Sequence, residues 1–254
     1  MNRTSISDLK AKAKDQLLGN YGIATGSFAL LFVLVYVIMI ILMSAITTGF
    51  MKDGSNVLES NLWGQVISQV FGMVIAIVTM LFTVGYIQIM RRIAYGERPV
   101  LSDLFHVFRT HPDKVIIVSF VMTAAQFLLL LPAMIVSGRG LVIGTGADAH
   151  FDGRKFLLWI ILYIAGFAVS VFIDIMLSMS FLIYLDEPET GVTEIMSGSI
   201  SLMKGNKFRY FYMTLSFIGY WFLAVLSFGI AFLWVVPYQT MTMVQFYKDL
   251  RGDI

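Results

Sequence analysis

Long runs of apolar side chains are the feature of this chain that most limits its possible folds. A transmembrane helix needs about 20 mostly apolar residues to cross the hydrocarbon core of a bilayer. Runs of at least this length, with few or no charges, occupy residues 23–46, 62–90, 115–136, 156–185 and 208–247. Hydrophobic residues make up 58% of the 254 residues and charged residues 13%, whereas a water-soluble domain has about 45–50% and about 25%. We therefore expect lipid to surround most of the polypeptide.

The last apolar run predicts two crossings. It has Arg209 as its only formal charge and is roughly twice as long as one crossing requires. We expect a turn near Ser227-Phe228-Gly229, because glycine tolerates the backbone of a tight hairpin, and Pro237 predicts a kink in the sixth helix. The fold class predicted is an all-α membrane protein, a bundle of six transmembrane helices. An alternative ends the fifth helix before Pro237 and lays the remainder on the surface, which gives five spans.

The distribution of Lys and Arg predicts the orientation. Fourteen of the 18 Lys and Arg residues lie before the first predicted span, between the second and third, between the fourth and fifth, or after the sixth. Because positive charge is retained on the cytoplasmic side, we expect both termini in the cytoplasm of a multi-pass cell-membrane protein. A signal peptide is the alternative for residues 23–46, but this run exceeds the 7–15 residues of a signal core.

A repeated unit, a cytoplasmic amphipathic helix followed by a transmembrane hairpin, is predicted within a single integral membrane domain, residues 1–254. The three units are placed at about 5–95, 97–187 and 190–250. Their amphipathic faces are formed by Ile6, Leu9, Ala13 and Leu17; by Leu101, Leu104, Phe105 and Phe108, opposite Asp103; and by Val192, Ile195, Met196 and Met203. The first helix is predicted to lie at the membrane surface with snorkelling lysines. Chance amphipathicity of polar connections is the alternative.

Two of the unit junctions share a motif. Gly19 and Asn20 lead into the first hairpin, and Gly205 and Asn206 lead into the third. The second junction, at residues 108–112, matches loosely. This helix-junction motif is a candidate site.

Asp174 is the one carboxylate well inside a predicted span. An ionised Asp at a helix centre costs roughly 2.5–3.5 kcal/mol on insertion scales, so a reason for keeping it is expected. It is either a binding or proton-relay group facing a cavity or a protonated acid that joins helices by a hydrogen bond. We favour the structural role, because transporters usually carry several intramembrane ionisable groups. The candidate partners are neutral: Gln65, Gln69, Gln88 and Gln126.

Other chemistry has little support in the sequence. The chain has no cysteine and a net charge of +2, which disfavours thiolate chemistry and nucleic-acid binding. His106, His111 and His150 lie in polar connections without metal-ligand spacing, and the glycine-rich segment 137–155 lacks the Lys-Ser/Thr of a phosphate loop. We predict no metal, no cofactor and no enzymatic activity. The spacing of Gly22 and Gly26 would permit close helix approach, which is weak evidence alone.

Several motifs together resemble a known family. They are Gly19-Asn20-Tyr21-Gly22, Met203-Lys204-Gly205-Asn206, Pro237-Tyr238 and Phe246-Tyr247-Lys248-Asp249-Leu250. The chain resembles, over essentially its whole length, the bacterial integral membrane proteins known as domain of unknown function nine-seven-five. The resemblance implies a six-helix membrane protein of bacteria with Gram-positive-type envelopes and implies no reaction.

The expected function is that of a non-enzymatic, accessory, protective or sensing component of envelope machinery. Its partners would be the lipid bilayer and a membrane protein. The alternative is a transporter or lipid-handling protein with an internal polar cavity near Asp174. The pseudo-threefold repeat differs from the inverted twofold repeats common in transporters, which favours the accessory role.

Overall fold

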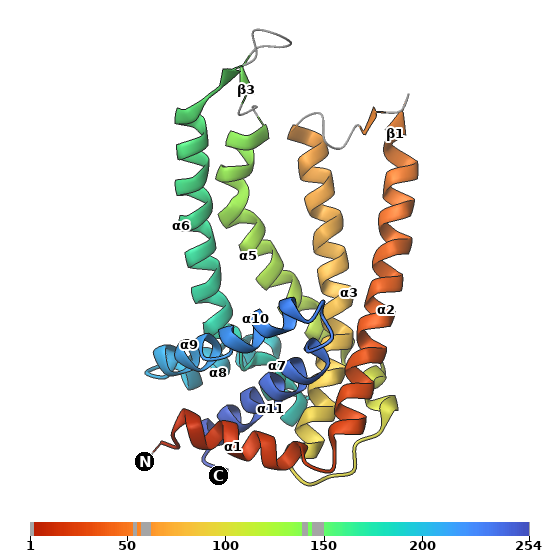
Figure 1. Cartoon of the computed structure of the whole chain (residues 1–254), viewed down its shortest axis with the longest axis vertical. Helices are drawn as coiled ribbons and strands as arrows, with labels where there is room; N and C mark the ends of the chain where they lie inside the picture. The colour runs from red at the N-terminus through yellow and green to blue at the C-terminus, as the bar shows by residue number, and fades with distance from the viewer. Residues whose placement is uncertain (1–2, 53–54, 57–61, 139–141, 144–149, 254) are drawn as a thin grey trace. The chain divides into compact units, whose positions relative to one another are not determined.

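The computed structural model describes residues 3–52, 55–56, 62–138, 142–143 and 150–253, and the side chains within 3–44, 66–137 and 151–253. The long helices are α2 (Tyr21–Phe50), α3 (Leu62–Ala94), α5 (Pro112–Gly138) and α6 (Gly153–Leu177) (Figure 1). The shorter helices are α1 (Ile6–Leu17), η1 (Leu101–Phe105), α4 (His106–Arg109), α7 (Ser180–Asp186), α8 (Val192–Met203), α9 (Lys207–Leu215), α10 (Ile218–Leu226) and α11 (Phe232–Arg251). Two antiparallel pairs of two-residue strands join β1 (Met51–Lys52) to β2 (Ser55–Asn56) and β3 (Val142–Ile143) to β4 (His150–Phe151).

Four helical segments in the described part of the chain are long and apolar enough to cross a membrane. They are Tyr21–Ser44, Val66–Ala94, Pro112–Ser137 and Gly153–Asp186. The shortest has 24 residues, which at 1.5 Å per residue gives about 36 Å, more than the roughly 30 Å hydrocarbon core. The predicted all-helical fold is confirmed, and the first four predicted spans are found as helical segments long and apolar enough to cross a membrane.

The fifth and sixth predicted spans are not found as spanning helices among the described residues. α9 and α10 have nine residues each, and a nine-residue helix is about 14 Å long. The predicted turn is confirmed: Phe228 and Gly229 have φ angles of 52° and 89°. α11 continues through Pro237, so the structure has no helix end just before that residue, where the five-span alternative placed one.

Hydrogen bonds from neighbouring residues and from α1 stabilise the break between α9 and α10. The hydroxyl of Ser216 donates to the carbonyl of Met213 at 2.5 Å, and the backbone N–H of Phe217 donates to Thr214 at 3.0 Å. The ammonium group of Lys10 on α1 donates to the carbonyl of Ser216 at 3.2 Å. Because Lys10 donates a hydrogen bond to the Ser216 carbonyl, the loss of one hydrogen bond within the helix costs little free energy.

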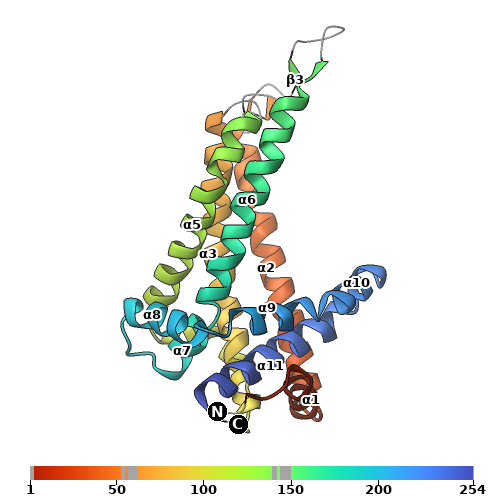
Figure 2. The ribbon, with the colours of Figure 1, turned by 90° about the vertical axis from the view of Figure 1, so that its left-hand side faces the viewer.

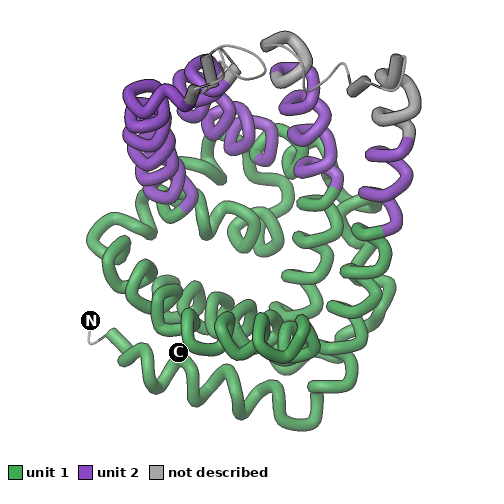
Figure 3. Tube along the Cα trace, turned by 45° about the horizontal axis from the view of Figure 1, so that its top comes forward, with its two compact units in different colours: residues 1–36, 79–118, 175–254 green, residues 37–78, 119–174 purple. Residues whose placement is uncertain are grey.

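The chain divides into two compact units, coloured in Figure 3. Unit 1 comprises residues 1–36, 79–118 and 175–254, and unit 2 comprises residues 37–78 and 119–174. In unit 1, α1 packs against α11 and α7 packs against α8; α1 and α11 can be followed in Figure 2. The largest fully buried side chains all belong to this unit: Leu9, Leu17, Ile89, Met90, Leu104, Met179, Leu182, Tyr184, Ile195, Phe217, Phe246 and Tyr247.

Unit 2 contains residues 37–50 of α2, 62–78 of α3, 119–138 of α5 and 153–174 of α6. Large apolar side chains on each of these helices are exposed, including Ile41, Val70, Leu128, Ile161 and Ile164. Water would make such continuous apolar exposure unfavourable, so these faces fit a lipid environment.

The predicted amphipathic faces have different outcomes. In α1, Leu9, Ala13 and Leu17 are fully buried. This face packs inside the protein, because α11 covers it, and does not lie open to the membrane surface as predicted for a free interfacial helix. In α8, Ile195 and Met203 are buried as expected.

The middle amphipathic segment is not the continuous helix that the sequence predicts. It is a short 3₁₀ helix, η1, followed by the four-residue α4. Leu104 is buried, but Leu101, Phe105 and Phe108 are exposed. Asp103, which was expected on the polar face, is buried. Its Oδ2 accepts a hydrogen bond from the Val100 N–H at 3.0 Å and forms an ion pair with Arg92 Nη1 at 3.2 Å, and these contacts compensate for the burial of the carboxylate.

Candidate functional site

Asp174 lies on α6 and Gln126 on α5, and the two side chains form a polar pair within unit 2. The amide Nε2 of Gln126 donates to Oδ1 and Oδ2 of Asp174 at 3.2 and 3.1 Å. Both side chains are half-buried. The amide thus occupies both carboxyl oxygens and joins two apolar helices by polar contacts.

The other predicted polar residues are not joined to this pair by hydrogen bonds between described side chains. Gln69 is exposed on the part of α3 in unit 2. Gln88 is buried on the part of α3 in unit 1, and its Oε1 accepts no hydrogen bond from the described residues. Gln65 falls on α3, but its side chain lies outside the described residues.

The two helix-junction motifs have the same local geometry. Gly19 and Gly205 follow α1 and α8 with φ angles of 84° and 78°, a left-handed conformation that glycine adopts without steric penalty. The Nδ2 groups of Asn20 and Asn206 donate to the backbone carbonyl four residues earlier, at 3.0 and 2.9 Å. Glycine reverses the chain and asparagine satisfies a carbonyl at the helix end.

The helices before these junctions also correspond. α1 and α8 each have 12 residues, and their buried residues occupy the fourth, eighth and twelfth positions. These residues are Leu9, Ala13 and Leu17 in α1, and Ile195, Ser199 and Met203 in α8. The correspondence concerns two segments; the architecture of three repeated units stays a prediction.

Asp186 is the centre of a polar cluster that sequence reasoning missed. Its Oδ1 lies 2.6 Å from Nε of Arg91, at the end of α3, and its Oδ2 accepts a hydrogen bond of 2.7 Å from the hydroxyl of Tyr247 on α11. One carboxylate thus connects α3, α7 and α11.

Asp249 is the centre of a second cluster. Its Oδ2 lies 2.6 Å from Nη1 of Arg209 on α9, and its Oδ1 accepts from the backbone N–H of Thr4 at 3.1 Å. Burial alone would raise the pKa of the Asp249 carboxyl, but the hydrogen bonds from Thr4 and Arg209 outweigh it and hold the pKa below its usual range. The N-terminal segment, α9 and α11 are joined here.

The carboxyl end of α3 is capped from two other helices. The carbonyl of Ala94 accepts from Nζ of Lys248 at 2.8 Å and from Nε2 of Gln16 at 3.2 Å. Helix ends leave carbonyls without intrahelical partners, and a cation there also interacts favourably with the helix dipole. Sequence reasoning placed Arg91 and Asp186 only at the ends of spans, because pairing across 95 residues has no local signal.

These clusters neutralise charge and hold segments together. In the part of the chain that the structure describes, no three His, Asp or Glu side chains are grouped as a metal ion would require. Within these clusters, the carboxyl groups of Asp186 and Asp249 and the hydroxyl of Tyr247 are hydrogen-bonded to protein partners.

Comparisons with curated proteins and with solved structures find no match to this chain. A comparison with protein-family models matches residues 1–253 to the family described as "Protein of unknown function (DUF975)". This match covers the junction motifs, the Asp174 pair and both polar clusters, and the chain therefore belongs to the DUF975 family.

Proposed function

We propose that this protein is a non-enzymatic component of a bacterial cell membrane that supports, protects or senses other envelope machinery. The observation that carries the proposal is the use of charged side chains in unit 1. Asp186 with Arg91 and Asp249 with Arg209 form ion pairs of 2.6 Å that hold helices together. Helices that ion pairs hold together within unit 1 suit a membrane-anchored binding platform.

We also propose a four-crossing topology with both termini in the cytoplasm. α1 carries Lys10, Lys12 and Lys14 and packs along α11 through fully buried side chains. Because α1 precedes the first span and is strongly charged, α11 belongs on the cytoplasmic side with it. Four crossings, like six, return the C-terminus to the side of the N-terminus, and the same 14 Lys and Arg residues stay on that side.

Site-specific photo-crosslinking tests the accessory role. We expect benzoylphenylalanine at Ile161, an exposed apolar position on α6, to form an adduct with a membrane protein in living cells. The matched control is the same amino acid at exposed Tyr163 on α6, two residues further on and therefore about 200° around the helix, which resolves the contacting face. Adducts with lipid alone at both positions would contradict the role.

The alternative function, transport through a polar cavity, has a specific observation behind it: the Asp174–Gln126 pair lies between two apolar helices. The accessory role requires this pair to be dry, whereas transport requires water to reach it. The chain has no cysteine, so an introduced cysteine is the sole thiol.

Thiol accessibility therefore separates the two functions. In permeabilised membranes we expect Gln126→Cys to resist a charged, water-soluble methanethiosulfonate reagent, while Glu189→Cys, 87% exposed at its native side chain, reacts fully. Rapid reaction of Gln126→Cys at the rate of Glu189→Cys would favour transport and count against the accessory role.

A further inference from the structure

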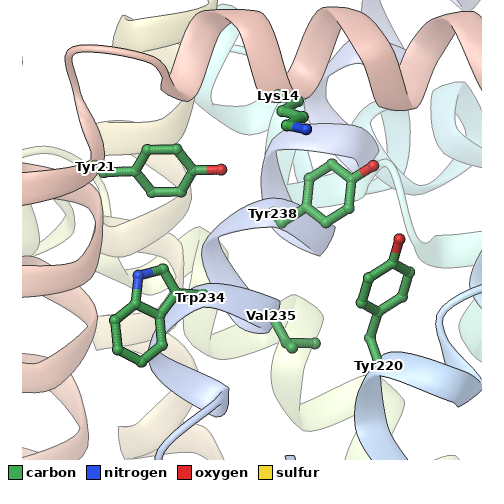
Figure 4. A pocket seen from close by; sticks show the side chains of 6 residues that line it. All are labelled: Lys14, Tyr21, Tyr220, Trp234, Val235 and Tyr238. Carbon is green, nitrogen blue, oxygen red and sulfur yellow. The ribbon is translucent and has the colours of Figure 1, made fainter. Parts of the chain in front are cut away.

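A pocket of about 270 Å³ opens between four helices of unit 1. Its lining residues come from α1, α2, α10 and α11: Lys14, Tyr21, Tyr220, Trp234, Val235 and Tyr238. Figure 4 shows the Lys14 ammonium group and the hydroxyls of Tyr21 and Tyr220 pointing towards the Tyr238 side chain. Segments more than 200 residues apart in the sequence thus present polar groups to one space.

The polar groups of this pocket are suited to an anion. Lys14 forms no ion pair with a described residue, and the hydroxyls of Tyr21, Tyr220 and Tyr238 form no hydrogen bond with one. None of the six lining residues is acidic. An ammonium group and three hydroxyls that can donate match the oxygen acceptors of a phosphate group.

The wall of the pocket is held in place by aromatic packing. The rings of Tyr220 and Tyr238 lie edge to face with centroids 5.9 Å apart, and each also contacts the ring of buried Phe217, at 5.7 and 5.2 Å. The ammonium group of Lys10, one helical turn before Lys14, lies 4.2 Å from the Phe217 ring centroid. A second cation next to the pocket strengthens the attraction for an anion.

An apolar groove of about 670 Å³ is lined by residues of α2, α10 and α11, three of the four helices that line the pocket. Phe28 and Phe32 of α2 form one side of the groove, and the α10–α11 turn forms the other. Tyr21 of the pocket and Phe28 and Phe32 of the groove follow the i, i+7, i+11 spacing of one face of α2, so the pocket and the groove both open onto this face. A polar pocket beside an apolar groove matches a lipid, which has a phosphate next to acyl chains.

The expected depth of the pocket in the membrane agrees with a phospholipid ligand. Lys14 lies just before α2, whose spanning segment begins at Tyr21, and Tyr and Trp side chains prefer the boundary between headgroups and hydrocarbon. We propose that the pocket and groove together bind one anionic phospholipid of the cytoplasmic leaflet, with its phosphate at Lys14 and the tyrosine hydroxyls and an acyl chain along α2. This inference rests on the proposed membrane placement, but not on the accessory role.

Native mass spectrometry of the full-length, delipidated protein in detergent tests the site. We expect phosphatidylglycerol to bind more tightly than phosphatidylcholine of the same acyl chains. Lys14→Gln should weaken phosphatidylglycerol binding about fivefold, which corresponds to about 1 kcal/mol for one lysine near an anionic surface. Lys12→Gln on the same helix removes the same charge but is not part of the pocket lining and should change binding less than twofold.

Further variants keep the test decisive. Phe32→Ala should weaken phosphatidylglycerol binding, whereas Phe120→Ala, a similarly exposed Phe on α5, should not. Tyr238→Phe, which removes one hydroxyl, should weaken binding and substitutes for Lys14→Gln if that variant misfolds. Equal effects of Lys12→Gln and Lys14→Gln, equal binding of both lipids, or displacement of the lipid by millimolar inorganic phosphate would overturn the proposal. The crosslinking result at Ile161 is independent of all these outcomes.

Discussion

Two adjacent carboxylates, Asp186 and Glu187, differ in how firmly the fold holds them. The Asp186 side chain is 11% exposed and contacts both Arg91 and Tyr247, whereas Glu187 is 51% exposed and pairs with Arg251 at 3.1 Å. Asp186→Ala leaves a largely buried guanidinium without its partner, so we expect it to lower the free energy of unfolding by about 3 kcal/mol. Glu187→Ala should cost less than about 1 kcal/mol. Thermal unfolding followed by circular dichroism in detergent measures both, and equal losses would contradict the assignment.

Asp249 gives unit 1 a dependence on acid pH. Because the folded-state pKa of its carboxyl is lowered, the carboxylate stabilises the fold above its ordinary unfolded pKa of about 3.9. That contribution is lost as the pH falls through the folded-state pKa. We expect the unfolding midpoint of the wild type to fall between about pH 5 and pH 3 more steeply than that of Asp249→Asn, which has no carboxyl to protonate. Parallel pH curves for the two proteins would show that Asp249 makes no such contribution.

For single residues, the sequence identifies a residue whose type is unusual for its surroundings. It does not identify a residue whose role depends on a partner far away in the chain. Asp174 is conspicuous because it is a carboxylate within an apolar run, and its partner Gln126 was among the neutral candidates. Arg91 and Asp186 look like ordinary span ends, and only the fold shows that they pair across 95 residues. The same limit applies to Lys14, which resembles any lysine of an amphipathic helix.

Among the elements, the contact of α3 with η1 depends on one glycine. A Cβ at Gly85 would lie 2.1 Å from the carbonyl oxygen of Leu104, a backbone atom that can move only with its helix. We expect Gly85→Ala to destabilise the protein by about 1–3 kcal/mol through overpacking. Gly26→Ala on α2 is the matched control, because a Cβ there meets nothing within 4 Å. Its effect should be neutral or slightly stabilising, and a Gly85→Ala variant as stable as Gly26→Ala would refute this account of the contact.

Hydropathy located the first four spans because each contains a helix of at least 25 residues, whose length and composition are local properties. It could not separate α9, α10 and α11, since a broken apolar segment and a continuous one have the same composition. The break depends on a hydrogen bond from Lys10 to the carbonyl of Ser216, and these two residues are 206 positions apart in the sequence. By contrast, the turn at Phe228-Gly229 and the glycine–asparagine junctions were predicted because a left-handed backbone conformation has a residue-type signature.

For the whole molecule, the number of crossings decides where the α10–α11 turn lies. Tags on the termini cannot distinguish four crossings from six, because both even numbers place the termini on the same side. Phe228 at the tip of this turn is 99% exposed and can distinguish them, since six crossings would bring it to the outer surface. In intact cells we expect Phe228→Cys to resist a membrane-impermeant maleimide, as a turn on the inner side or in the inner leaflet would.

Two single-cysteine variants calibrate that experiment. Arg154→Cys, at the start of α6, should be labelled in intact cells, and Glu189→Cys, after α7, should be labelled only after permeabilisation. Labelling of Phe228→Cys at the rate of Arg154→Cys would establish six crossings and move the apolar groove away from the cytoplasmic leaflet. With four crossings, the exposed Phe222 and Leu226 of α10 and Phe228 and Ile230 of the following turn lie on the cytoplasmic side, where the inner leaflet is the apolar surface that can cover them. Lys14 and these apolar side chains then face the same leaflet, so an anionic phospholipid of that leaflet offers a phosphate for Lys14 and acyl chains for the turn.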